Sequence, residues 1–249
     1  MATPDTDADV VVVGGGPAGL TAATFTARAG LDTVLYDHGE SILARNAHLE
    51  NVPGFPLGVD PRRFLDLCAE WAERNGVSLR RGEVAEVERD ERFSLAVGEG
   101  TASADYVVAA SWADASYLDG LSIEEADRGT KTFLQPDDRG RTNVPGLYAA
   151  GRLAERYHQA VVAAGSGATA ALTLIADSEV PFYHDWVVPE GYFTGRGREV
   201  PPGCEEIDDE ERERRARASR ELVRERFAEP HPEEPTMHPA VEADAESDD

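Results

Sequence analysis

The sequence predicts an α/β fold with a parallel central sheet, on the strength of three stretches of the chain. Residues 10–13 are four valines, and a β-branched run of this kind suits a short strand buried on both faces. A helix of small residues, 17–29, follows at once, and Gly30 ends it before a second strand at 33–36. The apolar run 104–110 suits another strand inside a parallel sheet.

Three glycines join the first strand to the helix. Gly14, Gly16 and Gly19 fall at the spacing G-x-G-x-x-G. The first permits a tight turn, the second lets a pyrophosphate approach the backbone, and the third lets the helix pack closely on the strand. The helix begins with Pro17 and Ala18, where free N–H groups and the positive end of the helix dipole face the phosphates. The stretch predicts a dinucleotide site.

Asp37 ends the second strand, 18 residues after Gly19. An acidic residue at this position accepts hydrogen bonds from the hydroxyl groups of an adenosine ribose. A surface aspartate after a strand would explain Asp37 taken alone. Its place behind the glycines, the strand and the helix favours the nucleotide role.

Net charge argues against some classes of partner, and the residue composition indicates the habitat of the organism. The 249 residues can bury a full core, and their net charge of −24 argues against nucleic acid or an anionic membrane surface as a partner. Lys131 is the single lysine among 24 basic residues, against 48 acidic ones. This pattern is typical of proteins from salt-loving organisms, so we interpret the acidity as halophilic adaptation.

The two cysteines form no C-x-x-C pair. Cys68 lies among apolar residues and is expected in the core, while Cys204 lies in a Pro/Gly-rich segment with no visible partner. No metal-binding cluster is predicted. The N-terminus lacks a basic region and no apolar run approaches 18 residues, so we expect a cytoplasmic protein without a membrane span.

Turn residues and periodicity place the elements in the middle of the chain. Asp60 is expected to cap a helix that starts at Pro61 and closes at Asn75-Gly76, and Trp71 on its apolar stripe fits core packing better than cofactor stacking. We expect a loop over 39–61, short strands at 77–79, 82–88, 93–97 and 132–134, and a turn-rich segment over 111–131.

A second motif, T-N-V-P-G-L-Y-A-A-G-R, spans residues 142–152 and predicts a turn, a buried strand over 147–150 and a tight bend at Gly151. The helix that follows, 159–176, is rich in glycine and alanine, including Gly165 and Gly167. It must pack very close to a neighbour, which is either the sheet or a flat cofactor.

The sequence predicts four regions. Residues 1–177 form the main domain, with a small antiparallel β element beside the parallel sheet, 178–206 form an irregular aromatic extension, 207–228 form a charged helix, and 229–249 form a disordered acidic tail. Within the helix, Glu210/Arg214 and Glu213/Arg217 are expected to pair.

Together these motifs resemble the FAD domain of the thioredoxin reductase family, over about residues 8–110 and 132–176. The resemblance rests on V-V-G-G-G-P-A-G-L-T-A-A, N-V-P-G-F-P, and V-P-G-L-Y-A-A-G followed by Q-A-V-V-A-A-G-S-G. It implies a single Rossmann-like FAD-binding domain, a flavoprotein, with a homodimer as an expected assembly. The implied cofactor-binding residues are Gly14, Gly16, Pro17, Ala18, Gly19, Asp37, Asn51, Val84, Gly151, Arg152, His158, Gln159 and Ala160.

In the family that the chain resembles, the loop asparagine, here Asn51, lies beside the flavin. The backbone N–H groups of Gln159 and Ala160 would serve the flavin C2 carbonyl, where charge accumulates on reduction. His158 stands where the family has arginine, and it would donate to the reduced ring or lie exposed at the helix start. Arg152 replaces the family's aspartate and would reach the pyrophosphate.

The family also places an NAD(P)H domain, with a second glycine motif and a C-x-x-C, between the two halves of the FAD domain. Here about twenty residues, 111–131, occupy that position, which is too few for a domain.

The sequence leaves three functions open. The first is an FAD-dependent oxidoreductase that receives electrons from a separate protein or a diffusible donor, with one face of its flavin open or covered by the aromatic segment 182–193 as a lid. The second is a non-catalytic flavin-dependent binding or regulatory protein, and the third is an NAD-binding protein. The catalytic residues, the substrate and the donor are not predicted.

Overall fold

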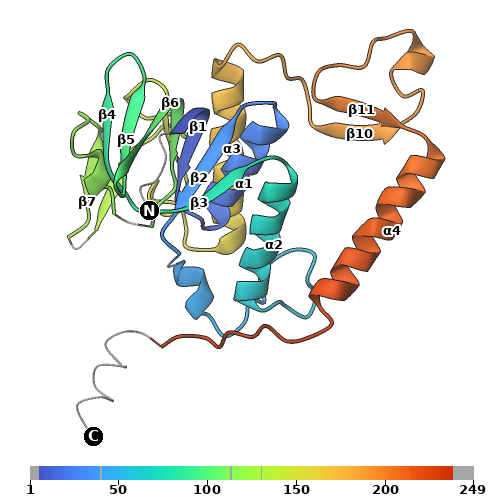
Figure 1. Ribbon diagram of the computed structural model, residues 1–249, viewed down its shortest axis with the longest axis horizontal. Coiled ribbons are helices and arrows are strands. Elements are labelled where there is room, and N and C mark those ends of the chain that lie inside the picture. Colours follow the sequence, from blue (N-terminus) through green and yellow to red (C-terminus); the bar gives the residue numbers. More distant parts are fainter. Residues whose placement is uncertain (1–5, 40, 113, 130, 238–249) are drawn as a thin grey trace, which may run out of the picture.

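The computed structural model describes residues 6–39, 41–112, 114–129 and 131–237. One mixed sheet forms its centre, and helices cover one face of this sheet (Figure 1). Residues 182–226, which we call the arm, lie beyond the helices (Figure 1). The candidate site is positioned by the sheet, by the helices packed on it and by the loops that follow its strands.

The sheet has seven strands in the order β3-β2-β1-β6-β5-β4, with β9 also paired to β6. Its parallel part consists of β1 (Thr6–Val13), β2 (Thr33–Asp37), β3 (Ser78–Arg81), β6 (Gly100–Ala109) and β9 (Leu147–Ala149). The strands β4 (Val84–Arg89) and β5 (Phe93–Val97) are antiparallel to their neighbours. The predicted fold class, a parallel sheet with a small antiparallel element, is confirmed.

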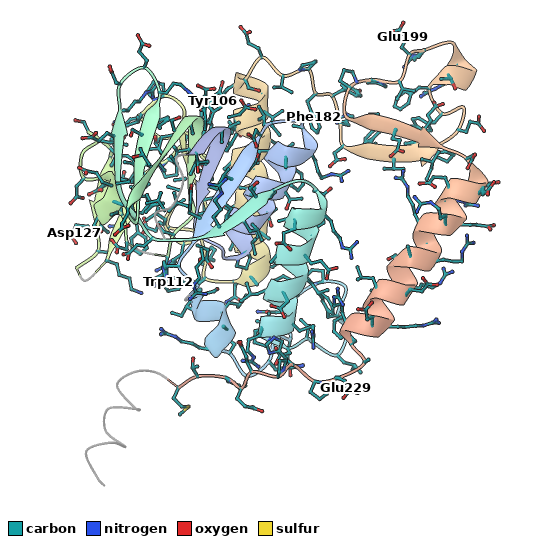
Figure 2. The ribbon with its side chains drawn as sticks, in the orientation of Figure 1. Tyr106, Trp112, Asp127, Phe182, Glu199 and Glu229 are labelled. Atoms are coloured by element: carbon teal, nitrogen blue, oxygen red, sulfur yellow. The ribbon has the colours of Figure 1, made fainter. Side chains whose placement is uncertain are left out.

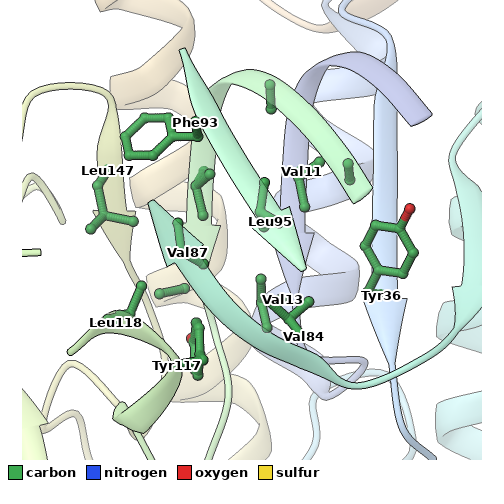
Figure 3. Close-up of a cluster of buried hydrophobic side chains, with 14 of the residues drawn as sticks. Val11, Val13, Tyr36, Val84, Val87, Phe93, Leu95, Tyr117, Leu118 and Leu147 are labelled. Atoms are coloured by element: carbon green, nitrogen blue, oxygen red, sulfur yellow. The ribbon is translucent and has the colours of Figure 1, made fainter. Parts of the chain in front are cut away.

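Strand β1 is buried on both faces, which explains its four valines. Val10 and Val12 pack against the helices, while Val11 and Val13 face side chains of β4 and β5. Figure 3 shows Val11 and Val13 beside Leu95 and Val84, in the buried cluster on the side of β4 and β5. Because alternate side chains of a strand point to opposite faces, a strand covered on both sides must be apolar throughout.

Two helices of small residues pack against each other over the sheet. They are α1 (Pro17–Arg28) and α3 (Ala160–Asp177). At Gly167 a Cβ atom would come within 2.1 Å of the carbonyl oxygen of Ala18. At Gly167 the close neighbour of this glycine-rich helix is therefore α1, while Ala170, Ala171 and Leu174 of the same helix pack in a cluster with strands of the sheet.

Among the described residues, α3 is the one helix long and apolar enough to cross a membrane, judged by length and composition alone. The expectation that no apolar stretch approaches 18 residues is wrong on that criterion. Ala170, Ala171, Leu174 and Ile175 of α3 pack into the cluster that also contains α1, as in a core helix of a globular domain.

Helix α2 (Pro61–Arg74) starts as predicted. The Asp60 carboxylate accepts hydrogen bonds from the backbone N–H groups of Arg62 and Arg63. Cys68 packs against the apolar cluster, and burial raises the pKa of its thiol to about 11. The ring of Trp71 meets that of Phe25 edge to face, with centroids 6.4 Å apart, so both predicted core residues pack inside the domain.

Two segments that the sequence predicts as loops contain short structure. The loop after β2 includes η1 (Ile42–Arg45) and an isolated bridge between Leu49 and Val59. The turn-rich segment after β6 includes η2 (Ser116–Leu118) and β7 (Glu125–Asp127), which pairs antiparallel with β8 (Thr132–Leu134). These pieces are three or four residues long, which is too short for periodicity to reveal them.

The aromatic extension is more regular than predicted. Strands β10 (Trp186–Pro189) and β11 (Cys204–Ile207) pair in parallel, with η3 (Thr194–Arg196) in the loop that joins them. The Glu206 carboxylate accepts hydrogen bonds from the backbone N–H groups of Gly191, Phe193 and Thr194. One side chain thus orders a connection that lacks any sequence period.

Helix α4 (Asp209–Arg226), capped by Asp208, has no buried residue. Arg214 pairs with Glu211 at 2.6 Å, so the expected Glu210/Arg214 pair is wrong, whereas Arg217 lies 3.9 Å from Glu213 as expected. Arg226 binds Glu70 of α2 at 2.8 Å, which fastens the far end of the helix to the domain.

The first part of the acidic tail lies against the domain. Residues 229–237 contain no helix or strand, and His231 Nε2 lies 3.1 Å from an Asp66 carboxylate oxygen on α2. Arg63 also donates to the carbonyl oxygen of Glu229. The prediction of disorder for residues 238–249 concerns positions outside the described residues.

Candidate functional site

A cavity of about 370 Å³ opens at the carboxyl ends of the parallel strands. Val13 ends β1, Asp37 ends β2, and Ala110 and Gly151 follow β6 and β9; all four line the cavity. The chain leaves β1 toward β2 on one side and reaches β6 on the other. This is the topological switch point, where open α/β sheets bind their ligands.

Each glycine of the first motif has a separate structural role. Gly14 has φ +112°, and a Cβ there would lie 2.6 Å from the carbonyl oxygen of Ala110. At Gly19 a Cβ would lie 1.9 Å from the carbonyl oxygen of Gly14, so this glycine lets α1 pack on the turn. At Gly16 a Cβ would meet nothing within 4 Å, which leaves backbone accessible on the cavity wall.

Asp37 is fixed at the cavity wall by the glycine turn. Its Oδ1 accepts a hydrogen bond from the backbone N–H of Gly15 at 3.1 Å. The backbone N–H of Gly14 donates to the carbonyl oxygen of Tyr36 at 2.8 Å, which holds the turn against the end of β2. A carboxylate in this position can accept hydrogen bonds from hydroxyl groups of a ligand.

Two helices begin at the cavity, and neither has a side-chain cap. Gly16 precedes α1 and Gln159 precedes α3, and no side chain accepts a hydrogen bond from the first turn of either helix. In contrast, α2 and α4 start at the carboxylates of Asp60 and Asp208. Uncapped first turns offer N–H groups and positive dipole ends to an anionic ligand.

The second motif supplies the opposite wall. Gly151 has φ +68° and its N–H donates to Ser166 Oγ of α3 at 3.0 Å. The guanidinium of Arg152 stacks on the ring of Phe133, 4.7 Å from its centroid, and donates to the carbonyl oxygen of Arg156. Arg152 is thereby held at the cavity, while its contact with a pyrophosphate stays a prediction.

His158 and Trp112 meet at the cavity, with ring centroids 4.4 Å apart and planes 66° apart. Burial lowers the pKa of His158, and the charges of Arg152 and Lys131 lower it further. The imidazole is therefore neutral at pH 7. Lys131 Nζ lies 5.5 Å from the centre of the Trp112 ring.

The structure brings nearly all of the predicted site residues to one place. The cavity is lined by Gly14, Gly16, Pro17, Ala18, Asp37, Val84, Gly151, Arg152, His158, Gln159 and Ala160. Gly19 lies beneath the turn instead. Asn51 lies outside the lining, and its side-chain amide donates to Gln159 Oε1 at 2.5 Å.

Sequence reasoning missed several residues of the wall, three of which follow β6 along the chain. Ser111, Trp112 and Tyr117 line the cavity, and Ser111 Oγ lies 2.9 Å from the hydroxyl of Tyr117. Burial raises the pKa of Tyr117, so this hydroxyl stays protonated. The available signal was position, because these residues follow a buried parallel strand at its carboxyl end.

The aromatic segment 182–193 contributes no residue to the cavity, so its proposed role as a lid is wrong. Figure 2 shows why, since Phe182 and Trp112 lie at opposite ends of the central sheet. The segment continues from the C-terminal end of α3, whereas the cavity lies at the N-terminal end of that helix. Among the described residues, no three His, Cys, Asp or Glu side chains form a group that could hold a metal ion.

Comparisons with known proteins agree with this geometry. A family model described as "Pyridine nucleotide-disulphide oxidoreductase" matches residues 44–167, and one described as "NAD(P)-binding Rossmann-like domain" matches residues 12–73. The thioredoxin reductase of Mycolicibacterium smegmatis is 35% identical over 132 residues, which cover 52% of this chain and 42% of that protein. The chain contains a thioredoxin reductase-like FAD domain.

Other relatives of this thioredoxin reductase-like domain match in the same way. The thioredoxin reductase of Aquifex aeolicus is 38% identical over 86 residues, 34% of this chain and 27% of that protein. A solved thioredoxin reductase from Gloeobacter violaceus has a TM-score of 0.63 at 19% identity, over 69% of this chain and 95% of that one, and shares the fold. The chain spans less than half the length of the curated relatives it matches.

The cavity fits FAD on its own chemistry. The uncapped starts of α1 and α3 suit the pyrophosphate and an electron-rich carbonyl group, and Asp37 suits the ribose hydroxyls. When bound, FAD supplies the capacity to accept and pass on electrons. Which of the cavity residues contact it stays a prediction.

Proposed function

We propose that this chain is an FAD-dependent oxidoreductase that takes its electrons from an external donor. The short connection between the two halves of the FAD domain supports this proposal most directly. Strand β6 ends at Ala109 and β8 begins at Thr132, and the described residues between them form η2 and β7. This is the position at which the resemblance implies an NAD(P)H domain.

The residues around the cavity suit electron exchange by a flavin. The first turn of α3 supplies backbone N–H groups at Ala160, which would stabilise negative charge on a reduced ring. His158, neutral and packed on Trp112, offers one ring nitrogen as a donor and the other as an acceptor. Val84 and Ala163 add apolar surface to the cavity wall.

A protein is the donor or acceptor that we propose first. The relatives carry the name thioredoxin reductase, and they match this chain only over part of their length. The described residues include both cysteines, and burial holds the Cys68 thiol largely protonated, with a pKa of about 11. Electrons that reach the FAD would therefore pass to an acceptor without a disulfide formed between Cys68 and Cys204.

Anaerobic reduction of the FAD-loaded protein tests this proposal. NADH, NADPH and a reduced protein donor are added separately, and loss of flavin absorbance is followed at high salt. Dithionite serves as the control for chemical reducibility. Bleaching by a protein donor or a diffusible donor, with reoxidation by an acceptor, supports the proposal. Protein that takes up no FAD contradicts it.

A second candidate is a non-catalytic flavin-dependent binding or regulatory protein. The buried Cys68 and the absence of a C-x-x-C from the 249 residues favour it. Two results together would support this function over the oxidoreductase. Dithionite would reduce the bound FAD while every other donor leaves it oxidised, and the protein would form a stable complex with a partner.

A further inference from the structure

Two cations lie beside the cavity without a carboxylate partner. Within the described part of the chain, no carboxylate oxygen forms an ion pair with Lys131 or with Arg152, whereas Arg128, Arg141 and Arg226 each pair with one. Acidic residues outnumber basic ones by 48 to 24. Lys131 and Arg152 are therefore not neutralised by an ion pair with a described carboxylate.

Aromatic contacts hold both cations in position. Arg152 stacks on the buried ring of Phe133 at 4.7 Å, and Lys131 lies 5.5 Å from the centre of the Trp112 ring. Trp112 in turn packs against His158 at 4.4 Å. Arg152, Trp112 and His158 line the cavity, and Lys131 lies over the ring of Trp112, which places both cations near one part of the cavity.

The nearby carboxylates are already engaged. Glu155, whose charge acts on Arg152, pairs with Arg128 at 2.9 Å. Asp114, on the cavity wall, accepts hydrogen bonds from the backbone N–H and the hydroxyl of Ser116. Asp37 and Glu83 also line the cavity, but they lie at the ends of β2 and β4, on the side of the glycine turn.

We propose that Lys131 and Arg152 form an oxyanion subsite that holds a phosphate or carboxylate group of a small reactant, which exchanges electrons with FAD as a second partner beside the protein donor or acceptor. Trp112 supplies an aromatic surface beside that group, and the neutral His158 supplies a hydrogen bond without adding charge. The assignment of the anion to a reactant rests on the proposed oxidoreductase function. The subsite itself rests on the two unpaired cations and their aromatic supports.

Isothermal titration calorimetry of the FAD-loaded protein tests the subsite. Inorganic phosphate is titrated in one experiment and acetate in another, at a constant ionic strength set with chloride. Flavin absorbance of each sample reports FAD occupancy. Loss of one charge-assisted contact weakens anion binding about tenfold or more, so Lys131→Gln and Arg152→Gln should each do so. Lys131→Arg keeps the positive charge and should retain anion binding. Arg198→Gln makes the same change of charge on the exposed arm and should leave anion binding unchanged.

Saturable binding of either anion with this pattern of variants supports the subsite, and the tighter anion names the reactant's group. No saturable binding, or binding that neither Lys131→Gln nor Arg152→Gln weakens, overturns it. Binding to FAD-free protein alone also overturns it, because the cations then serve the pyrophosphate of FAD. Anion binding that follows the predicted pattern in a protein whose FAD no donor reduces would contradict the proposed function and leave the subsite standing.

Discussion

The side-chain amide of Asn51 donates to the side-chain oxygen of Gln159 at 2.5 Å. Asn51 belongs to the proline-rich loop before α2, and Gln159 is the residue that precedes α3. One hydrogen bond therefore connects two segments that lie 108 residues apart. It fixes the loop against the uncapped helix start that lines the cavity.

Replacing Asn51 by alanine should weaken FAD binding about two- to tenfold, because one hydrogen bond contributes about 0.5–1.5 kcal/mol. Fluorescence titration with FAD measures the change. Asn143→Ala is the matched control, since this amide bonds Glu124 and Ser122 away from the cavity. Equal FAD affinity in the wild-type protein and Asn51→Ala would show that the loop does not support the site.

Gly167→Ala should destabilise the fold by about 1–3 kcal/mol, because its Cβ would overlap the carbonyl oxygen of Ala18 at 2.1 Å. Gly165→Ala, in the same helix, meets nothing within 4 Å and should stabilise the protein by about 0.5–1 kcal/mol. Urea unfolding measures both. Similar changes for the two variants would refute the close contact of α1 and α3 at Gly167.

The arm depends on Asp185, whose two carboxylate oxygens each lie 2.5 Å from the Arg28 guanidinium. Asp185→Asn should lower the free energy that holds the arm against the domain by about 1 kcal/mol or less, as expected for a partly exposed ion pair. Limited proteolysis should then cut the chain near residue 180 up to about fivefold faster. FAD affinity should not change, because no arm residue from 182 to 193 lines the cavity. Glu190→Gln is the control, and a loss of FAD binding in Asp185→Asn would contradict the separation of arm and site.

His158 should make stability depend on pH. Burial and the charges of Arg152 and Lys131 lower its pKa below the ordinary value of 6.5, so the unfolded chain binds the proton more readily than the folded protein. The contribution of His158 is complete above pH 6.5 and is lost as the pH falls through the lowered pKa. Relative to His158→Gln, the wild-type unfolding free energy should decrease between pH 7 and pH 5. Parallel curves would contradict the assignment.

Much of the central domain could be predicted from sequence because its signals are local. The four valines, the glycine spacing and Asp37 define a strand, a turn and a ligand end within 28 residues, 10–37. The Asp60 cap and the Gly151 bend also follow from residue type. These features depend on backbone conformation and burial, which the residues themselves determine.

The rest depends on contacts between distant segments. Trp112 enters the site because β6 places it there, and Lys131 lies over it from the far end of the same connection. The pairing of β10 with β11 depends on Glu206 reaching back to residues 191–194. The role of Gly167 depends on Ala18, and no sequence period records that contact.

Titration of the purified, FAD-free protein with FAD at high salt tests the central claim most directly. Flavin fluorescence and absorbance should report saturable binding of one FAD per chain, in the cavity between the starts of α1 and α3. Gly16→Val should weaken that binding strongly, because its backbone faces the cavity without a neighbour within 4 Å. Protein that shows no saturable FAD binding, or equal binding with Gly16→Val, would contradict the assignment of the cavity as the FAD site.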